Sequence, residues 1–374
     1  MRIYFIGQKG IPAKFGGIER HVEDLSVRLA EMGHEVFVYT RPNYTKKELT
    51  EYRGVKLISI PSISTKHLDA ITHTIRACFD LAKRDADIGH FHSIGPSSLI
   101  WLAKLLQPRT PIVSTFHTKC YLHAKWGIFA KIYLKFGEWT ACKLADKTIT
   151  VSHSLTKYAK GKYQTRPCYI PNGVSVPSDD TAGLSIKRWG LNRGGYMLVV
   201  SRLIGHKGIH YLIDAYKKIK TDKKLVITGD GAHTNDYVER LKKMAQGNSD
   251  IIFTGNQTGI VLQELYRNAY IFVQPSESEG LSIALLEAMA YGNAVIISDI
   301  PENIEAASKL GITFRSGDAD DLKEKLEYIL ERPDLVFKLG SLGRKRVERC
   351  YNWNNIARET VKVYEEIIMK KLRN

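Results

Sequence analysis

Two carboxylates, eight positions apart, mark the segment of the chain best suited to bind a ligand. Glu279 directly precedes Gly280, and Glu287 lies within the range 282–290, where apolar residues recur at helical spacing. The apolar stretch 270–273 leads into this segment and predicts a strand. The spacing therefore places Glu279 in the loop before a helix and Glu287 about two turns into that helix.

This strand–loop–helix pattern suits a ligand that combines phosphate with hydroxyl groups. The first turn of a helix has free backbone N–H groups and a partial positive charge, which favour a phosphate. A carboxylate accepts hydrogen bonds from paired hydroxyls, such as those of a ribose or another sugar. The segment therefore predicts a site for a phosphate flanked by polyols, which is the make-up of a nucleotide sugar.

Two cations flank a second strand-to-helix turn. The stretch 196–200 predicts a strand, and Arg202 and Lys207 follow it before the next expected helix. During sugar transfer, two such charges can neutralise a departing diphosphate without a metal ion. The alternative is a pair of solvated surface charges. Because the carboxylates and the cations should lie at strand ends of one sheet, the combination favours a binding site.

A pair of glycines, Gly16 and Gly17, precedes the first expected helix. Glycine lets the backbone approach a phosphate or a sugar closely, although such a pair also serves simply as a turn. The segment has neither the G-x-G-x-x-G spacing of dinucleotide sites nor the Lys-Ser/Thr of a P-loop. Neither NAD nor a P-loop nucleotide is therefore favoured.

One histidine in the first half could take part in chemistry. His117 follows the expected strand 112–115, so it should face a ligand cleft at the strand ends. A neutral imidazole there can bind a sugar hydroxyl or assist proton transfer, and the alternative is a histidine that binds nearby backbone. His90 and His92, at the end of an earlier strand, are expected to be structural.

Short apolar runs alternate with amphipathic stretches, which predicts parallel sheets covered by helices. A polar, turn-rich stretch at 177–195 interrupts the pattern, which then restarts. The helices expected in the first half include 17–32 and 68–83. The expected strands are 3–6, 36–39, 55–60, 88–91, 112–115, 148–151 and 169–170, and then 196–200, 225–228, 251–253, 270–274, 294–298 and 312–314.

The chain of 374 residues is long for one domain, and the restart divides it into two. We expect an α/β protein with two doubly wound, Rossmann-like domains that face a cleft. Residues 1–178 form the N-terminal, acceptor-side domain, and residues 179–354 form the C-terminal, donor-binding domain. The helix at about 355–374, part of a longer helical pattern from 353 to 372, has no following strand and can pack back on the first domain.

The net charge of +16 is concentrated in the first 180 residues, which carry +11 of it. Nucleic acid, an anionic membrane surface or anionic substrates can each explain such an excess. No nucleic-acid-binding motif accompanies the charge, so we expect no nucleic-acid partner. No apolar window reaches the length of a membrane-spanning helix. The five cysteines are scattered and lack metal-ligand spacing, which favours a cytoplasmic protein without a metal site.

The stretch 119–147 is basic and rich in aromatic residues. Its six lysines are interleaved with aromatic side chains at spacings that fit a helix. Such a helix can lie on an anionic membrane, which would make the protein peripheral at the inner face of the cytoplasmic membrane. The alternative is a helix whose aromatic stripe belongs to the core and whose lysines are solvated.

These motifs together resemble the family-4 retaining glycosyltransferases of GT-B fold, and the similarity touches nearly the whole chain. It rests on Gly16-Gly17, on Arg202-x4-Lys207, and on Glu279-x7-Glu287 within a Pro-Ser-x-x-Glu-Gly…Glu-Ala-Met-Ala frame. The segment 171–174, Pro-Asn-Gly-Val, resembles another recurring segment of that family. The opening segment 10–19 is further similar to bacterial rhamnosyltransferase-like members, which act in surface-polysaccharide synthesis.

The resemblance implies a role for each matching residue. Arg202 and Lys207 would hold the donor diphosphate, and Glu287 would bind the ribose of the nucleotide. Glu279 would bind hydroxyls of the transferred sugar, helped by backbone N–H groups of Gly280, Leu281 and Ser282. Gly16-Gly17 would approach the donor from the first domain, and His117 would match the family's cleft histidine.

The resemblance also implies a hexosyltransferase that retains anomeric configuration, needs no metal ion or other cofactor, and has a C-terminal helix that crosses back to the first domain. The acceptor would be a glycan or a lipid-linked saccharide. Two departures concern the sugar: many members have aromatic-Gly at Leu281-Ser282, and rhamnosyltransferase-like members often have Asp near His117. The alternatives are a nucleotide-sugar epimerase of related fold and a basic nucleic-acid-binding protein.

Overall fold

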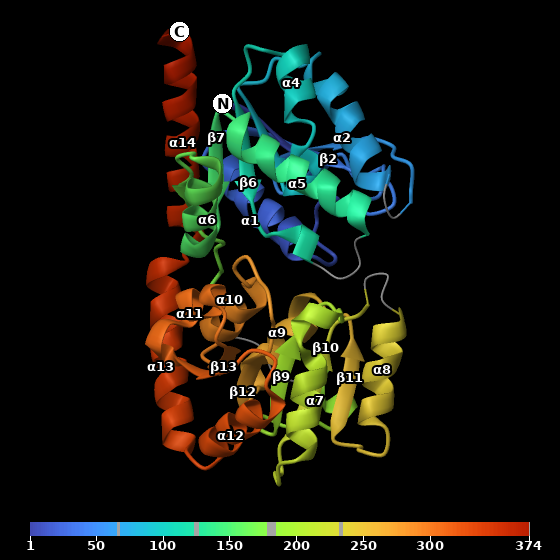
Figure 1. Ribbon diagram of the computed structural model, residues 1–374, viewed down its shortest axis with the longest axis vertical. Coiled ribbons are helices and arrows are strands. Elements are labelled where there is room, and N and C mark those ends of the chain that lie inside the picture. The colour runs from blue at the N-terminus through green and yellow to red at the C-terminus, as the bar shows by residue number, and fades with distance from the viewer. Residues whose placement is uncertain (66–67, 123–126, 178–184, 232–234, 374) are drawn as a thin grey trace. The chain divides into compact units, whose positions relative to one another are not determined.

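The computed structural model describes residues 1–65, 68–122, 127–177, 185–231 and 235–373. The chain forms two compact units, and each contains one predominantly parallel sheet (Figure 1). Unit 1 comprises Met1–Gly173 and Trp353–Asn374, and unit 2 comprises Val174–Asn352. The boundary that we expected at 178/179 falls outside the described residues. The last helix starts at Trp353, two positions before the expected 355.

Unit 1 is built on an eight-stranded sheet in the order β3-β4-β2-β1-β5-β6-β7-β8. Its neighbouring strands run parallel except for the β3–β4 pair, which is antiparallel. The strands are β1 (Arg2–Ile6), β2 (Glu35–Thr40), β3 (Glu51–Tyr52), β4 (Val55–Ser59), β5 (Ile88–His92), β6 (Ile112–Phe116), β7 (Lys147–Thr150) and β8 (Cys168–Tyr169).

The helices of unit 1 bury both faces of this sheet. On β1, Ile3 and Phe5 pack with residues of the first and last helices, while Tyr4 and Ile6 join a second core on the opposite face. Burial on both faces explains why this strand is apolar from Ile3 to Ile6 instead of alternating. The helices are α1 (Gly17–Glu31), α2 (Leu68–Leu81), α3 (Ile94–Ser97), α4 (Ile100–Leu106), α5 (Ile128–Lys143), α6 (His153–Tyr163) and α14 (Trp353–Arg373), with a 3-10 turn η1 at Cys120–Leu122.

Unit 2 has a fully parallel six-stranded sheet in the order β11-β10-β9-β12-β13-β14. The strand order reverses between β9 and β12, which is the topological switch point where doubly wound folds bind ligands. The strands are β9 (Tyr196–Val200), β10 (Lys224–Thr228), β11 (Ile251–Gly255), β12 (Ile271–Gln274), β13 (Ala294–Ser298) and β14 (Gly311–Phe314).

Seven α-helices of the described chain connect and cover the strands of unit 2 (Figure 1). Residues of β9, β10, β12 and β13 share one apolar core with residues of these helices, including Leu212 and Leu326. The helices are α7 (Ile209–Lys217), α8 (Asn235–Ala245), α9 (Gly259–Asn268), α10 (Ile283–Ala290), α11 (Pro301–Ala307), α12 (Ala319–Leu330) and α13 (Pro333–Cys350), with 3-10 turns η2 (Ser185–Trp189), η3 (Gly205–Lys207) and η4 (Ser308–Leu310).

The two Rossmann-like α/β units confirm the predicted fold class, and the last helix belongs to unit 1 as expected. One strand was not expected: β3, at Glu51–Tyr52, forms a two-residue antiparallel hairpin arm with β4. Because β3 pairs with β4 through only two residues, it is too short to show an apolar periodicity in the sequence. None of the described helices is both long enough and apolar enough to cross a membrane.

Candidate active site

All of the predicted donor residues in unit 2 except Glu287 lie on two neighbouring loops, which we name the donor loops. The first, residues 201–208, follows β9, and the second, residues 275–282, follows β12. Since β9 and β12 pair as parallel neighbours, both loops leave the same edge of the sheet at its switch point. The topology therefore brings together residues that are more than 70 positions apart in the sequence, such as Lys207 and Glu279.

Lys207 and Glu279 form an ion pair across the two donor loops. Lys207 Nζ lies 2.5 Å from Glu279 Oε1, and the two side chains are 13% and 9% exposed. Gln274, the last residue of β12, also donates to Glu279 Oε1 from Nε2 at 2.8 Å. Two donors thus converge on one carboxylate oxygen, so the carboxylate of Glu279 is held in place before any ligand binds.

Gln274 was missed by the sequence analysis. Its side chain is buried, donates to Ser276 Oγ at 2.7 Å, and accepts from Ser282 Oγ at 3.4 Å. It therefore connects the strand end to both ends of the second donor loop. The available signal was its position: an amide that ends an otherwise apolar, fully buried strand must find partners for its polar atoms.

The second donor loop ends in a capped helix. Ser282 is the N-cap of α10, and its Oγ accepts from the backbone N–H of Leu285 at 3.3 Å. This is the standard role of serine at a helix start. Gly280 and Leu281, which precede the cap, are buried.

Glu287 lies in the second turn of α10 and is partly exposed, slightly nearer the helix start than the expected two turns. Tyr266, from α9, donates its hydroxyl to Glu287 Oε2 at 3.0 Å. A tyrosine from a neighbouring helix therefore orients this partly exposed carboxylate.

Arg202 differs from Lys207 in its surroundings. Its side chain is exposed, and within the described residues its guanidinium makes no hydrogen bond or ion pair. Its backbone carbonyl accepts from Ser201 Oγ and from the N–H of Ile204, which shapes the first donor loop. The structure thus holds Lys207 in an ion pair and leaves the guanidinium of Arg202 available to an anion.

Backbone contacts fasten the two donor loops to each other. The N–H of Glu277 donates to the carbonyl of His206 at 2.9 Å. Gly208, with φ +69°, lies so close to the second loop that a Cβ there would be 1.9 Å from the carbonyl oxygen of Pro275. Tyr211, from α7, donates to Glu277 Oε1 at 2.6 Å. The loops therefore form one connected surface.

The glycine pair of unit 1 lies at the start of α1. Gly16, with φ +100°, is the N-cap, and Gly17 is the first helical residue. A Cβ on Gly16 would lie 2.1 Å from Glu19 Oε2, so no other residue fits without moving that carboxylate. Glu19 Oε1 accepts from the N–H of Lys9 at 3.1 Å, and Glu23 Oε2 accepts from the N–H of Ala13 at 2.7 Å. The two glutamates of α1 thus shape the loop that precedes the glycine pair.

His117 lies in a group of buried histidines in unit 1. Its Nε2 is 3.1 Å from His92 Nδ1, and the ring of His21, from α1, packs edge-on against it at a centroid distance of 4.8 Å. His90 lies next to His92, with ring centroids 4.2 Å apart. His21 was not among the predicted residues, since it occurs singly on a helix and its sequence context gives no signal.

Burial sets the charge state of these rings. It lowers the pKa of His21 to about 4, while the hydrogen bond between His21 Nδ1 and Asn172 Oδ1 acts in the opposite direction. It lowers the pKa of His90, His92 and His117 well below the usual range, and the neighbouring histidines add to the effect. All four imidazoles are therefore neutral near pH 7, as the proposed sugar-binding role of His117 requires.

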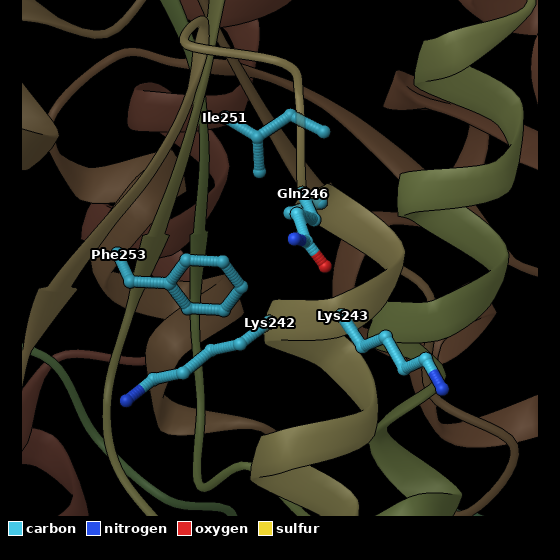
Figure 2. Close-up of a pocket in the computed structure, with 6 residues that line it drawn as sticks. Lys242, Lys243, Gln246, Ile251 and Phe253 are labelled. Carbon is cyan, nitrogen blue, oxygen red and sulfur yellow. The ribbon is translucent and has the colours of Figure 1, made fainter.

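A separate pocket of about 530 Å³ lies between the end of α8 and the edge strand β11 (Figure 2). Ile251 and Phe253 line it from the strand, and Lys242, Lys243 and Gln246 line it from the helix side. None of the predicted site residues lines it, and β11 is not one of the two strands at the switch point. The pocket is therefore distinct from the donor loops.

Comparison with known proteins assigns both units of the chain. Residues 15–176 match the family described as Glycosyltransferase Family 4, and residues 186–346 match Glycosyl transferases group 1. The chain belongs to these glycosyltransferases. The glycosyltransferase is 29% identical over 365 residues to the phosphatidyl-myo-inositol mannosyltransferase of Mycolicibacterium smegmatis, an alignment that covers 94% of this chain and 90% of the relative.

Two solved structures have the same fold as this glycosyltransferase. Sucrose-phosphate synthase from Thermosynechococcus elongatus superposes with a TM-score of 0.86 at 23% identity and covers 99% of both chains. HepE from Anabaena, in complex with UDP and glucose, gives a TM-score of 0.81 at 18% identity over 98% of this chain and 100% of the other. Both similarities concern the fold.

Proposed function

We propose that this glycosyltransferase moves a sugar from a nucleotide diphosphate-sugar to a hydroxyl of a glycan or lipid-linked saccharide acceptor. The observation that carries the proposal is the Lys207–Glu279 pair, which lies on the two donor loops beside Arg202. A cation for the diphosphate and a carboxylate for sugar hydroxyls thus meet at the switch point of unit 2. The relative from Mycolicibacterium smegmatis is a mannosyltransferase, and the structure of HepE holds UDP and glucose, which supports such a donor.

Each donor residue has a distinct task in this proposal. Arg202 and Lys207 neutralise the diphosphate as it departs, and the capped N-terminus of α10 adds its partial positive charge. Glu279 accepts hydrogen bonds from hydroxyls of the transferred sugar, with N–H groups of Gly280, Leu281 and Ser282 beside it. Glu287 accepts hydrogen bonds from the ribose. The diphosphate replaces Glu279 as a partner of Lys207, which frees the carboxylate for the sugar.

We propose a same-face displacement that retains anomeric configuration. The bond from the anomeric carbon to the diphosphate oxygen breaks, and a bond to the acceptor oxygen forms on the same face. The acceptor proton moves to the departing phosphate oxygen, so no protein carboxylate is consumed as a nucleophile. Gly16-Gly17 and His117 of unit 1 are assigned to the donor, with neutral His117 binding a sugar hydroxyl. Transfer is expected to need no metal ion, so it should persist in EDTA.

The identity of the donor's sugar is the most specific part of the proposal. The opening segment 10–19 resembles rhamnosyltransferase-like enzymes of bacterial surface polysaccharides, whereas the relative described above transfers mannose. A thermal-shift screen with thymidine diphosphate-rhamnose, GDP-mannose and UDP-glucose separates these donors, because a ligand that binds the folded state raises its stability. Donor conversion with no acceptor present would instead indicate the alternative epimerase.

Substitution of the donor residues tests the function directly. Glu279→Ala and Arg202→Ala should each lower transfer at least about a hundredfold, the loss typical of removing one group that stabilises charge in a transition state. Glu239→Ala, on α8, and Lys218→Ala, after α7, each remove one exposed charge and are controls that should retain transfer. If the two site variants stay as active as these controls, the proposed site is wrong. Nucleic-acid binding driven by charge would instead weaken steeply with salt and survive Glu279→Ala.

We further propose that α5 of unit 1 rests on an anionic membrane surface. Ile128, Phe129 and Ile132 are 76%, 88% and 60% exposed. The alternative, in which the apolar stripe of this helix belongs to the core, therefore does not hold for these three residues. Phe136 and Trp139 are also exposed, and Lys131, Lys135 and Lys143 lie along the same helix. Exposed aromatic and basic residues on one helix suit a lipid interface. Residues 123–126, part of the predicted stretch, lie outside the described residues.

Vesicle flotation tests this surface. The protein should float with phosphatidylglycerol vesicles and not with phosphatidylcholine vesicles, and a triple variant Phe129→Ser, Lys131→Ala, Lys135→Ala should lose the binding. The control variant Lys157→Ala, Lys160→Ala neutralises two exposed lysines of α6 and should still float. Unchanged flotation of the triple variant would remove α5 from the proposal.

A further inference from the structure

Three buried histidines of unit 1 converge from three separate elements, and we name them the histidine cluster: His21, His92 and His117. His21 comes from α1, His92 ends β5, and His117 follows β6. Each offers one ring nitrogen, and these three nitrogens lie within 4.8 Å of one another. In the described part of the chain, this is the one group of at least three histidine, cysteine or acidic residues with such spacing.

Hydrogen bonding aims a lone pair of His21 into the cluster. His21 Nδ1 lies 3.0 Å from Asn172 Oδ1, and because that oxygen can only accept, Nδ1 carries the proton and donates it. In the neutral ring, Nε2 then carries the lone pair. His21 Nε2 is fully buried and has no hydrogen-bond partner among the described residues. An unused buried acceptor of this kind costs free energy unless something binds it.

His92 and His117 cannot satisfy each other completely. His92 Nδ1 and His117 Nε2 lie 3.1 Å apart and share one proton, whichever ring provides it. His92 Nε2 is then left buried without a hydrogen-bond partner in the described chain. The cluster therefore holds two ring nitrogens with no protein partner, on two different elements.

The neighbouring His90 shows what a structural histidine looks like in the same core. Its Nδ1 lies 2.6 Å from the hydroxyl of Tyr364, and its Nε2 lies 2.7 Å from Thr115 Oγ1. Both nitrogens are thus satisfied by hydroxyls. The unused nitrogens of His21 and His92 are therefore not a necessary result of burial in this core, although His73 Nδ1, outside the cluster, also has no partner in the described chain.

We propose that the histidine cluster is a binding site for one divalent transition-metal cation, for which Zn²⁺ has the best matched chemistry. Neutral imidazole is a preferred ligand of Zn²⁺, and three protein ligands with one open position form a common zinc arrangement. Nitrogens about 2.0–2.1 Å from a tetrahedral zinc lie roughly 3.4 Å apart. One ligand nitrogen from each ring already lies within 4.8 Å of the other two, so small ring movements that shorten the longest separation complete the geometry.

Asn172 has a positioning role in this site. Metal-binding histidines usually donate their second ring nitrogen to an oxygen that fixes the tautomer, and Asn172 Oδ1 does this for His21. The side chains of His21 and His117 belong to residues with 3% and 6% exposure, while His92 is fully buried. Entry from the side of His21 and His117 is therefore the shorter path for the cation.

A cation in this site should also affect sugar transfer, an expectation that rests on the proposed function. A cation bound to His117 takes the nitrogen lone pair and fixes the ring that is assigned to the sugar. Zn²⁺ should therefore inhibit transfer reversibly, with activity restored by a chelator. Metal binding itself does not depend on the proposed function, so the two statements fail separately.

The test is a titration of the full-length, EDTA-treated and desalted protein with Co²⁺ as a spectroscopic probe and with Zn²⁺ by calorimetry. We expect one equivalent of either metal, an intense tetrahedral Co²⁺ spectrum, and a metal-induced rise in melting temperature. His21→Gln, His92→Gln and His117→Gln should each weaken binding by tenfold or more. Asn172→Ala, which removes no ligand, should weaken it about 10–100-fold.

Two controls separate this site from adventitious binding. His34→Gln removes the ring that lies 3.4 Å from the N-terminal amine, a pair of nitrogens that can chelate a metal away from the cluster. His153→Gln removes an exposed histidine at the start of α6. Both variants should keep the affinity and the spectrum of the parent protein. Loss of the spectrum in His34→Gln, or no tetrahedral spectrum in the parent protein, would overturn the proposal even if a cluster variant fails to fold.

Discussion

At the scale of single residues, the proposed donor site is organised around one carboxylate oxygen. Glu279 Oε1 accepts hydrogen bonds from Lys207 Nζ, 72 positions away on the other donor loop, and from Gln274 Nε2, 5 positions away at the end of β12. Partial burial makes each of these bonds stronger than it would be in water. Under the proposed function, Lys207 turns to the diphosphate when the donor binds, and Gln274 then holds Glu279 toward the sugar.

Gln274→Ala should therefore impair the sugar side of the site. A hydrogen bond to a charged group contributes about 1.5–3 kcal/mol, so we expect kcat/KM to fall roughly 10–150-fold. Affinity for the nucleoside diphosphate without its sugar should change little, because Gln274 acts through Glu279. Steady-state kinetics and calorimetry with the donor found in the screen measure the two quantities.

The matched control for this prediction is Ser276→Ala. Ser276 accepts the other hydrogen bond of the same amide at 2.7 Å and does not contact Glu279 in the hydrogen bonds of the described chain. Its loss of kcat/KM should be clearly smaller than that of Gln274→Ala. Equal losses in the two variants would mean that the amide only supports the loop and does not position Glu279.

At the scale of elements, the donor site depends on how closely two loops pack. Gly208 ends the first donor loop with φ +69° and approaches the carbonyl of Pro275, while Gly205, in the same loop, has nothing within 4 Å of the position of a Cβ. Glycine is therefore required at position 208, both by the backbone angle and by the nearby carbonyl. Neither constraint applies at Gly205.

Gly208→Ala should separate the donor loops. A Cβ at 1.9 Å from a backbone oxygen forces one loop to move, which we expect to destabilise unit 2 by about 1–3 kcal/mol or more and to weaken donor binding. Gly205→Ala is the internal control and should leave both properties nearly unchanged. Urea unfolding and donor titration of the two variants provide the measurement, and identical behaviour of the pair would contradict this account of the loops.

The sequence predicted regular elements better than the contacts between them. Strands β9 and β13 have the predicted bounds, because apolar runs between turn residues are strong local signals. The short β3 has no such signal, since it is stabilised by its pairing with β4.

The residues of the candidate site divide in the same way. Glu279, Lys207 and Arg202 were predicted because their types and spacing match a recognisable chemistry. His21 was missed because its importance comes from a partner that the fold brings close, Asn172, which is 151 positions away. Gln274 was missed although Glu279 is only 5 positions away, because the path of the second donor loop decides that the two side chains meet. A single sequence contains no direct record of such pairs.

At the scale of the whole molecule, the two units differ in how they should respond to acid. Unit 1 buries five histidines whose pKa values are lowered, chiefly by burial; for His21 and His73 the pKa is about 4. The other three are His90, His92 and His117. Among the described residues of unit 2, His210 has a lowered pKa, and it is only partly buried. The effect of histidine protonation on the free energy of unfolding is therefore concentrated in unit 1.

The sign of this effect follows from proton binding. Below pH 6.5 the histidines of the unfolded chain bind protons, while the buried rings of unit 1 stay neutral down to about pH 4 for His21 and His73. The unfolded state then binds more protons than the folded state, so the stability that these neutral rings contribute is complete above pH 6.5 and is lost as the pH falls. Between pH 7 and 5.5 the loss should be about 1 kcal/mol for each histidine, or roughly 5 kcal/mol for the five.

Hydrogen exchange in the presence of EDTA can measure this loss in each unit separately. After correction for intrinsic exchange rates, the opening free energy of amides in β5 and β6 of unit 1 should fall by several kcal/mol between pH 7 and 5.5, and that of β9 and β12 of unit 2 should fall much less. His73→Gln, which lies outside the histidine cluster, should remove about 1 kcal/mol of the pH dependence in unit 1. A parallel decline in both units would refute the assignment, because the buried histidines would then not be what makes the protein sensitive to acid.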